Sequence, residues 1–227
     1  SDSKAAAPVG TSLPTSVKDT PDPSPVSVPG LKRCAVAPSG AEACWELADP
    51  AMTAIPDGFL QANTNLTGTL RVGPAVQTIG PGTFFGTKLT GLDLSEATSL
   101  VEIGDSAFRG TDLGGTLVIP AKLTTIGTSA FQHTELTGLD LSNATSLVEI
   151  GDRAFLDAVL QGTLVMPPRV RTIGSEAFWN TELTGLDLSK ATSLVEIGDG
   201  AFYGTGLAGT LVMPATVAVQ TAMAYGE

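Results

Sequence analysis

An internal repeat constrains this chain more than any other feature of its sequence. Units of 24 residues, each opening with Leu-Thr-Gly-Leu-Asp-Leu-Ser, begin at Leu89, Leu136 and Leu183. Units of a second type, 23 residues long, alternate with them and begin at Leu66, Leu113, Leu160 and Leu207. A unit this short cannot bury its own apolar side chains, so the repeat predicts coils that stack on one continuous core.

Two short patterns inside each unit predict how a coil folds. In the second 24-residue unit, Leu139 and Leu141 flank Asp140, and this alternation predicts a strand with both leucines facing the core. The sequence Gly-Asp-x-Ala-Phe that follows is too short for a stable helix, and it predicts a single helical turn that places Phe155 in the core. Stacked coils of this kind advance about 4.8 Å per coil along the axis.

An aspartate follows the Ile-Gly pair in each 24-residue unit. The three copies are Asp105, Asp152 and Asp199. The first amides of a helical turn have no partner inside the turn, and an aspartate at this position accepts hydrogen bonds from them. We therefore expect these carboxylates to cap the predicted turns.

A six-residue motif, Ile-Gly-x-x-Ala-Phe, recurs through the repeats. Five intact copies and a looser first copy stand at Ile103–Phe108, Ile126–Phe131, Ile150–Phe155, Ile173–Phe178, Ile197–Phe202 and Ile79–Phe84. Together with the preceding Leu-x-x-Leu-x-Leu, this motif resembles the BspA-like class of leucine-rich repeats. The resemblance implies a β-rich, right-handed leucine-rich-repeat solenoid of alternating 23- and 24-residue coils, which binds other macromolecules and has no chemistry of its own.

The chain departs from that family at one position. Family members usually have a cysteine three residues after the motif phenylalanine. The corresponding residues here are Thr87, Thr111, Thr134, Ala158, Thr181 and Thr205. The departure leaves the expected fold unchanged.

Composition divides the chain into four predicted parts: an extended proline-rich arm over residues 1–33, an N-terminal cap over 34–65, the solenoid over 66–216 and a C-terminal tail over 217–227. Proline lacks an amide donor and fixes φ, so the six prolines of the arm exclude a helix or an inner strand. A disordered linker and a segment held by its own solenoid or by a partner chain both fit this composition. The first residue is not methionine, which indicates a removed targeting segment or a trimmed chain.

The two cysteines stand ten residues apart, just before the repeats. A disulfide between Cys34 and Cys44 would staple the first coil, and two buried free thiols are the alternative. The proximity of the pair to a chain terminus favours the disulfide. Because disulfides persist in oxidising surroundings, this interpretation places the protein outside the cell, on its surface or in an organelle lumen.

Charge and composition exclude several function classes. The 12 basic and 23 acidic residues give a formal charge of −11, which argues against a nucleic-acid partner because phosphate binding needs a positive surface. No apolar run reaches the roughly 18 residues of a membrane span. One histidine, His133, and two cysteines are too few for most metal sites. No catalytic residue, cofactor or metal is predicted, since no nucleophile–base pair can be assembled.

One row of residues is the candidate interaction surface. At the end of each predicted strand, aspartate and valine alternate from coil to coil, and we call this row the Asp/Val strip. Its members are Asp93, Val118, Asp140, Val165, Asp187 and Val212. A solvated, mildly acidic strip and a docking surface for a basic or polar protein are the two interpretations. The sequons at Asn65 and Asn143 are possible glycosylation sites.

Sequence and resemblance together favour a non-catalytic protein-binding or scaffold module, secreted or on the cell surface, whose partner is another protein or complex. The alternative is a peripheral structural subunit of a large membrane-associated assembly, for example lumenal and photosynthetic. Such a subunit would dock through its N-terminal arm and its solenoid end. The incomplete last coil favours this alternative because it exposes an apolar edge.

Overall fold

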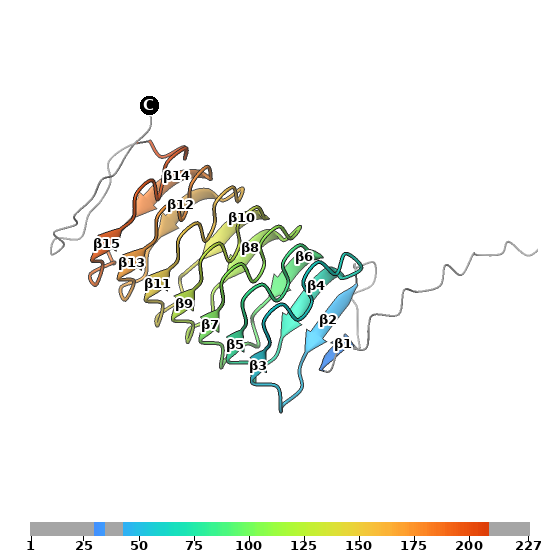
Figure 1. Ribbon diagram of the computed structural model, residues 1–227. Helices are drawn as coiled ribbons and strands as arrows, with labels where there is room; N and C mark the ends of the chain where they lie inside the picture. The colour runs from blue at the N-terminus through green and yellow to red at the C-terminus, as the bar shows by residue number, and fades with distance from the viewer. Residues whose placement is uncertain (1–29, 35–42, 209–227) are drawn as a thin grey trace, which may run out of the picture.

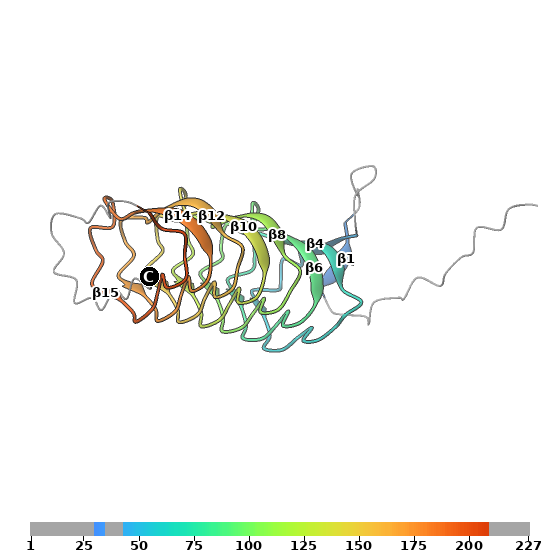
Figure 2. The same ribbon diagram turned by 90° about the horizontal axis from the view of Figure 1, so that it is seen from above.

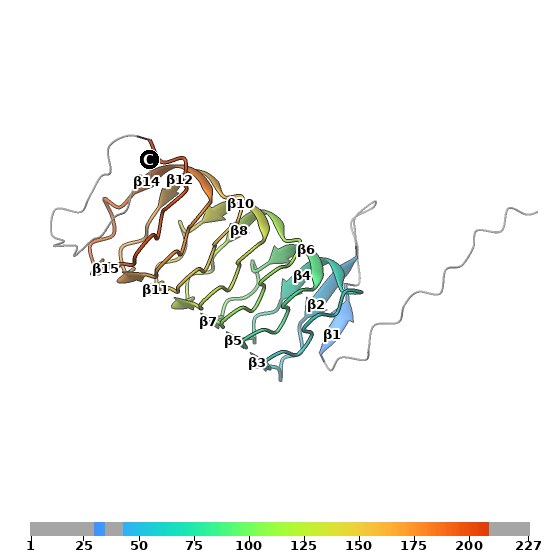
Figure 3. The ribbon, with the colours of Figure 1, turned by 45° about the horizontal axis from the view of Figure 1, so that its top comes forward.

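A computed structural model describes residues 30–34 and 43–208 of the chain. These residues form a rod of seven stacked coils and contain no helix (Figure 1). Each coil carries a long strand on one side and a two-residue strand on another (Figure 3). The predicted β-rich solenoid is therefore confirmed.

The strands alternate between these two sides along the chain. The long strands are β2 (Cys44–Leu47), β4 (Thr67–Val72), β6 (Lys88–Asp93), β8 (Gly114–Val118), β10 (Glu135–Asp140), β12 (Gln161–Val165) and β14 (Glu182–Asp187). The short strands are β3 (Ala54–Ile55), β5 (Thr78–Ile79), β7 (Glu102–Ile103), β9 (Thr125–Ile126), β11 (Glu149–Ile150), β13 (Thr172–Ile173) and β15 (Glu196–Ile197). One further strand, β1 (Leu31–Arg33), precedes the first coil.

The short strands form one continuous parallel sheet of seven, in the order β15-β13-β11-β9-β7-β5-β3, which we call the short-strand sheet. Each strand contributes one isoleucine that pairs with its counterparts above and below. Ile126, for example, is in register with Ile103 and Ile150. Every isoleucine of this column is buried, so the sheet runs along the core without interruption.

The long strands divide into three sheets, β1-β2-β4-β6, β8-β10 and β12-β14, and we call this side of the rod the long-strand side. All neighbours are parallel except β1, which is antiparallel to β2. Hydrogen bonding stops between β6 and β8 and again between β10 and β12. Both breaks fall where a 24-residue unit is followed by a 23-residue unit.

The Gly-Asp-x-Ala-Phe segment is not a helical turn, so that prediction is wrong. In each coil two residues four positions apart have positive φ on either side of the phenylalanine, for example Ser129 at 55° and His133 at 57°. The turn aims alternate amides along the rod axis, and the Phe131 N–H donates to the Ala154 carbonyl of the next coil at 2.8 Å. A helical turn would keep these amides inside their own coil. Bonding between coils has therefore overridden local backbone preference.

The aspartates expected to cap a helical turn instead join neighbouring coils. Asp105 Oδ1 accepts the amide of Thr128 at 2.8 Å, and Asp152 Oδ1 accepts the amide of Ser175 at 2.7 Å. Both donors belong to the following coil. The capping prediction is therefore wrong in its partner, because the segment has no helical amides of its own to cap. The coil that would follow Asp199 lies outside the described residues.

A column of phenylalanines forms the centre of the core. Neighbouring ring centroids are 5.1–5.3 Å apart and the rings are inclined by 3–12°. The column consists of Phe84, Phe108, Phe131, Phe155, Phe178 and Phe202. Stacked rings add to the burial energy of each side chain, so one ring in each of the last six coils holds these coils at an even spacing.

The glycine of the Ile-Gly pair lets the coils approach each other. A Cβ on Gly127 would lie 2.7 Å from the backbone nitrogen of Asp105 and the carbonyl carbon of Gly104. Backbone atoms of a paired coil cannot move aside as a flexible side chain can. The motif therefore requires glycine for close packing of the coils.

The threonines that replace the family cysteine are part of the core. Thr134 Oγ1 donates to the Phe131 carbonyl of its own coil at 2.9 Å, and four other copies make the same bond at 2.8–3.0 Å. In the coils of Thr87 and Thr111 the same carbonyl also accepts the threonine amide, at 3.1 and 3.3 Å, so the hydroxyl adds a second hydrogen bond within the turn. In the remaining coil the position is Ala158, which is buried.

The N-terminal end of the rod is closed by a cap. Cys34 and Cys44 form a disulfide, as predicted, with their Cα atoms 5.3 Å apart. Trp45, which follows Cys44, is buried and donates its Nε1–H to the Thr67 carbonyl at 2.7 Å. The Arg33 guanidinium lies over the Trp45 ring, 5.2 Å from its centroid. Disulfide, ring and cation together cover the first coil.

Candidate functional site

The Asp/Val strip lies at the carboxyl ends of the long strands. Val118 on β8 is in register with Asp140 on the neighbouring strand β10, and Val165 on β12 is in register with Asp187 on β14. The valine side chains are 46% and 40% exposed, respectively. The last predicted member, Val212, lies outside the described residues. Water-exposed valine on a rigid sheet is the apolar component that a protein-binding surface needs.

The aspartates of the strip each close a local turn. Asp140 Oδ1 accepts the Ser142 amide at 2.8 Å, and Asp187 Oδ1 accepts the Ser189 amide at 2.8 Å. Hydrogen bonds from these serines lower the pKa of Asp140 and of Asp187 below the usual aspartate range. Both carboxylates are therefore charged at neutral pH, and one oxygen of each is engaged in the turn.

The strip begins with a residue that the sequence analysis missed. Arg71 stands 47 residues before Val118, in register with Asp93, and its Nε lies 3.1 Å from Asp93 Oδ2. Burial raises the pKa of Asp93, but hydrogen bonds from Ser95 and Arg71 outweigh it and hold this pKa below its usual value. The 47-residue period was the signal that could have identified Arg71. Charge at this end of the strip is neutralised, whereas Asp140 and Asp187 face valine.

A hollow of about 690 Å³ opens where the sheet breaks between β6 and β8. Its floor is apolar and is formed by Leu92, Val118, Ile119 and Pro120. Polar groups, among them Asp93, Lys122 and Asn143, stand around it. An open apolar hollow of this size with a few polar groups has the character of a ligand site. It joins the Asp/Val strip, because Asp93 and Val118 belong to both.

Alternating loop lengths explain the hollow. After the long strand of a 24-residue unit, the buried Leu100 stands six positions after the buried Leu94. After the long strand of a 23-residue unit, the buried Leu123 stands only four positions after the buried Ile119. The short loop therefore lies between two longer ones, and the longer loop that follows is tied to it by the bond from the Ser146 amide to the Ala121 carbonyl at 3.1 Å.

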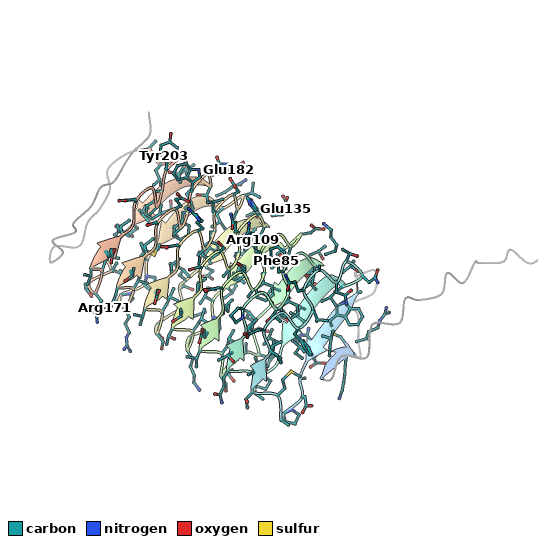
Figure 4. The ribbon with its side chains drawn as sticks, viewed as in Figure 1. Phe85, Arg109, Glu135, Arg171, Glu182 and Tyr203 are labelled. Carbon is teal, nitrogen blue, oxygen red and sulfur yellow. A yellow bond between two sulfur atoms is a disulfide. The ribbon has the colours of Figure 1, made fainter. Side chains whose placement is uncertain are left out.

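The face formed by the turns carries a second row of side chains, one position after each core phenylalanine. Figure 4 labels three of them, Phe85, Arg109 and Tyr203, which follow one another along the rod. The Arg109 guanidinium lies 5.7 Å from the centroid of the Phe85 ring. At the far end, the Trp179 and Tyr203 rings are 4.2 Å apart. These contacts join neighbouring coils and give the turn face a structural role.

The histidine is part of that turn face. His133 is exposed, and its Nδ1 lies 3.2 Å from Asp157 Oδ2. Asp157 also accepts a hydrogen bond from the Asn180 side chain at 2.7 Å. The three residues occupy equivalent positive-φ positions in successive coils. Their polar contacts therefore connect coils, like the ring contacts beside them.

The remaining predicted positions are on the surface. The sequon asparagines Asn65 and Asn143 are both exposed, and Asn143 stands beside the hollow. Within residues 30–34 and 43–208, no three His, Cys, Asp or Glu side chains come together in a way that would hold a metal ion.

The described ranges also include no helix with the length and apolar character needed to cross a membrane.

Comparison with known proteins identifies the repeat. The sequence profile of the BspA type leucine rich repeat region matches residues 77–208 in six copies, which is more than half of the 227 residues. A solved leucine-rich repeat protein from Bacteroides ovatus superimposes with a TM-score of 0.53 at 18% identity, over 85% of this chain and 60% of that chain. No curated protein gives a significant sequence match.

Two further solved structures match with lower scores. The pneumococcal vaccine antigen PcpA matches with a TM-score of 0.49 at 16% identity, over 85% of this chain and 70% of that chain. A leucine rich cell surface protein from Faecalibacterium prausnitzii matches with a TM-score of 0.40 at 14% identity, over 85% of this chain and 77% of that chain. At such identities the likeness concerns the fold alone.

Proposed function

Since the chain belongs to the BspA-type leucine-rich repeat family, we propose that it is a non-catalytic protein-binding module that acts outside the cell or on its surface. Proteins with this repeat present a rigid, extended surface, and function depends on the side chains placed on it. Binding is therefore assigned to the part of the rod whose exposed side chains suit a protein partner.

The observation that carries the proposal is the exposure of Val118 and Val165 on the long-strand side. Each valine stands in register with a charged aspartate, Asp140 or Asp187, on a strand whose backbone is held by its neighbour. Ordered backbone lowers the entropic cost of association, and exposed valine beside charge provides an apolar contact with a polar rim. The chemistry fits a partner that combines apolar with basic or polar groups.

The Cys34–Cys44 disulfide supports the proposed compartment. Structural disulfides persist in secreted and cell-surface proteins and are rare in the reducing cytosol. Thiol quantification on freshly isolated protein, with and without reductant, tests this part of the proposal. Free thiols at both positions in the native protein would contradict it.

The alternative, a peripheral subunit of a membrane-associated assembly, remains a prediction. It relies on the N-terminal arm and on the end of the solenoid, and residues 1–29 and 209–227 lie outside the described part of the chain. Native size fractionation of gently solubilised source material tests it. Co-migration with a large membrane complex would favour it over an independent recognition module.

The binding proposal is tested with a pair of matched variants. The full chain is measured by biolayer interferometry against a panel of purified secreted proteins and cell-surface ectodomains, first unmodified and then with Val118→Lys and Val165→Lys. The control carries Val101→Lys and Val195→Lys, two valines that are 38% and 56% exposed and directly precede the short strands β7 and β15. We expect the first variant to lose binding and the control to keep it.

Two outcomes would contradict this proposal. One is equal loss of binding in both variants, which would indicate a non-specific effect of added charge. The other is a bound partner that is insensitive to the long-strand variant, which would move the binding surface to another face. The substituted side chains are exposed, so the variants are expected to fold, and circular dichroism verifies this.

A further inference from the structure

The alternation of loop lengths that forms the hollow is repeated along the sequence. The hollow lies over the short loop 119–123, between the longer loops 94–100 and 141–147. The same alternation recurs 47 residues later, where the short loop 166–170 is bonded to the next long loop through the Ser193 amide and the Pro168 carbonyl at 3.1 Å. We call this side of the rod, with its alternating short and long loops, the recess edge.

The axial period of the recess edge matches one particular backbone conformation. Neighbouring coils are separated by about 4.8 Å along a parallel sheet, so two coils measure about 10 Å. A polyproline II helix has three residues per turn and rises about 3.1 Å per residue, so its turn measures about 9.3 Å. Every third side chain of such a helix, laid along the rod, therefore meets an equivalent point of the recess edge.

The chain itself carries a sequence of this type. Residues 18–29 read Lys-Asp-Thr-Pro-Asp-Pro-Ser-Pro-Val-Ser-Val-Pro, with proline at four of twelve positions. At a three-residue period, Pro23, Val26 and Pro29 fall on one face, and Ser24 and Ser27 fall on another. We propose that residues 18–29 bind along the recess edge of their own rod, with Val26 in the hollow and Pro23 at the next short loop.

Residues 18–29 join the rod on the side where the recess edge lies. Because β1 is antiparallel to β2, Leu31 pairs with Leu47 at the carboxyl end of β2, which is the end where the recess edge lies. A Cβ on the preceding Gly30 would touch Met52 and Asp49, which belong to the first of these loops. From this coil to the coil of loop 119–123 the rise is about 14 Å, which four to five residues of a polyproline II helix cover.

Charges on the two surfaces complement each other. The exposed side chains at the tips of the loops include Lys122, Arg169 and Lys190, and no ion pair within 4.0 Å joins them to another described residue. The segment carries Asp19 and Asp22, and Asp22 precedes the residue proposed to lie at loop 166–170. Bound as proposed, Asp22 lies about 3 Å beyond loop 166–170 along the rod, between the coils that carry Arg169 and Lys190.

Cross-linking of the full chain tests the proposed register. Because both native cysteines are in the disulfide, new cysteines can be introduced in pairs. The predicted pairs are Val26→Cys with Ala121→Cys, and Pro23→Cys with Pro168→Cys. The control pairs Val26→Cys with Thr128→Cys, an exposed position on the turn face. Mass spectrometry of non-reduced digests then identifies each bond.

We expect an intramolecular bond in both predicted pairs at dilute protein concentration, and no more than background in the control. Cross-links that appear only between two chains would overturn binding within one chain and assign the recess edge to a second copy. Equal cross-linking of predicted and control pairs would overturn the proposal altogether.

Proteolysis provides a second measurement without new cysteines. Tryptic cleavage after Lys18 is followed by mass spectrometry in the unmodified full chain and in a variant with Pro23→Asp and Val26→Asp. Loss of an apolar anchor corresponds to about a tenfold increase in the fraction of molecules whose residues 18–29 are not bound to the rod, so cleavage should accelerate by about that factor. The control, Ser24→Asp with Ser27→Asp, adds the same charge to another face and should change cleavage little. Equal acceleration in both variants would contradict the proposed face.

Discussion

On the short-strand side of the rod seven strands form one uninterrupted sheet, whereas on the long-strand side the strands divide into three sheets (Figures 1 and 3). The two sides belong to the same coils and to the same sequence repeat. What differs is the spacing of their buried residues. On the short-strand side each of the six units that open at Leu66 to Leu183 places its isoleucine and phenylalanine five positions apart, as in Ile126 and Phe131, and on the other side the spacing alternates.

This difference separates two tasks within one coil. The regular side carries the isoleucine, phenylalanine and glycine columns and holds the coils at one spacing. The irregular side carries the sheet breaks, the exposed valines and the hollow. Seen from above, the coils still follow one another evenly along the rod (Figure 2). Variation in loop length is thus confined to the side where it does not disturb the stack.

The largest expected effect is on the regular side. Phe131→Ala removes a fully buried ring that stacks on two neighbours, and it should lower the free energy of unfolding by about 3–5 kcal/mol. Leu139→Ala, at a partly buried position on the long-strand side, should cost distinctly less. Urea unfolding followed by circular dichroism compares the two. Equal losses would show that the two sides contribute equally to stability.

Glycine substitutions give the second comparison. Gly127→Ala brings a Cβ to 2.7 Å from backbone atoms of the preceding coil, and overpacking of this kind should cost about 3 kcal/mol. Gly115→Ala, on the long-strand side, meets no atom within 4 Å and is opposed only by its φ of 74°.

We therefore expect a cost of about 1 kcal/mol for Gly115→Ala, measured by the same unfolding experiment. If Gly115→Ala destabilised the protein more than Gly127→Ala, close approach of the coils would not be the reason for the glycine in the motif.

A smaller effect is expected from the threonine ladder. Thr134→Val removes the hydrogen bond to the Phe131 carbonyl but keeps the buried volume, and it should destabilise by about 1 kcal/mol. Thr116→Val replaces an exposed threonine on the long-strand side and should change stability little. The difference in thermal midpoint between the two variants is the measurement. No difference would mean that the hydrogen bond adds nothing beyond shape.

The smallest expected effect is the pH dependence of the Asp/Val strip. Hydrogen bonds from Ser142 lower the pKa of Asp140 in the folded protein, relative to about 3.9 in an unfolded chain. A lowered folded pKa contributes stability that is fully present above the unfolded value and is lost as pH falls through the folded value.

Lowering the pH from 7 to 3 should therefore destabilise an Asp140→Asn variant less than it destabilises the unmodified protein. Asparagine keeps the turn-closing oxygen but does not titrate in this range. Urea midpoints across this pH range are the measurement. An identical pH dependence would show that the titration of Asp140 does not affect stability.

The sequence alone determined the stack, because its periodicity states which residues must share a core. The leucine, isoleucine and phenylalanine columns follow from units too short to bury themselves. The position of the two cysteines favoured the Cys34–Cys44 disulfide over free thiols, and the structure contains that disulfide. The alternating Asp/Val strip also follows from that period. The same 47-residue period also places Arg71 at the start of this strip.

The tertiary structure alone decided the turns, the sheet breaks and the hollow. Residues such as Arg153 and Glu176 disfavour positive φ by themselves, and they adopt it because their amides then donate to carbonyls of the following coil. The Asp105 and Asp152 carboxylates likewise choose amides in the following coil. Local propensity describes one coil in isolation, whereas these conformations are stabilised by hydrogen bonds that exist only once neighbouring coils are stacked.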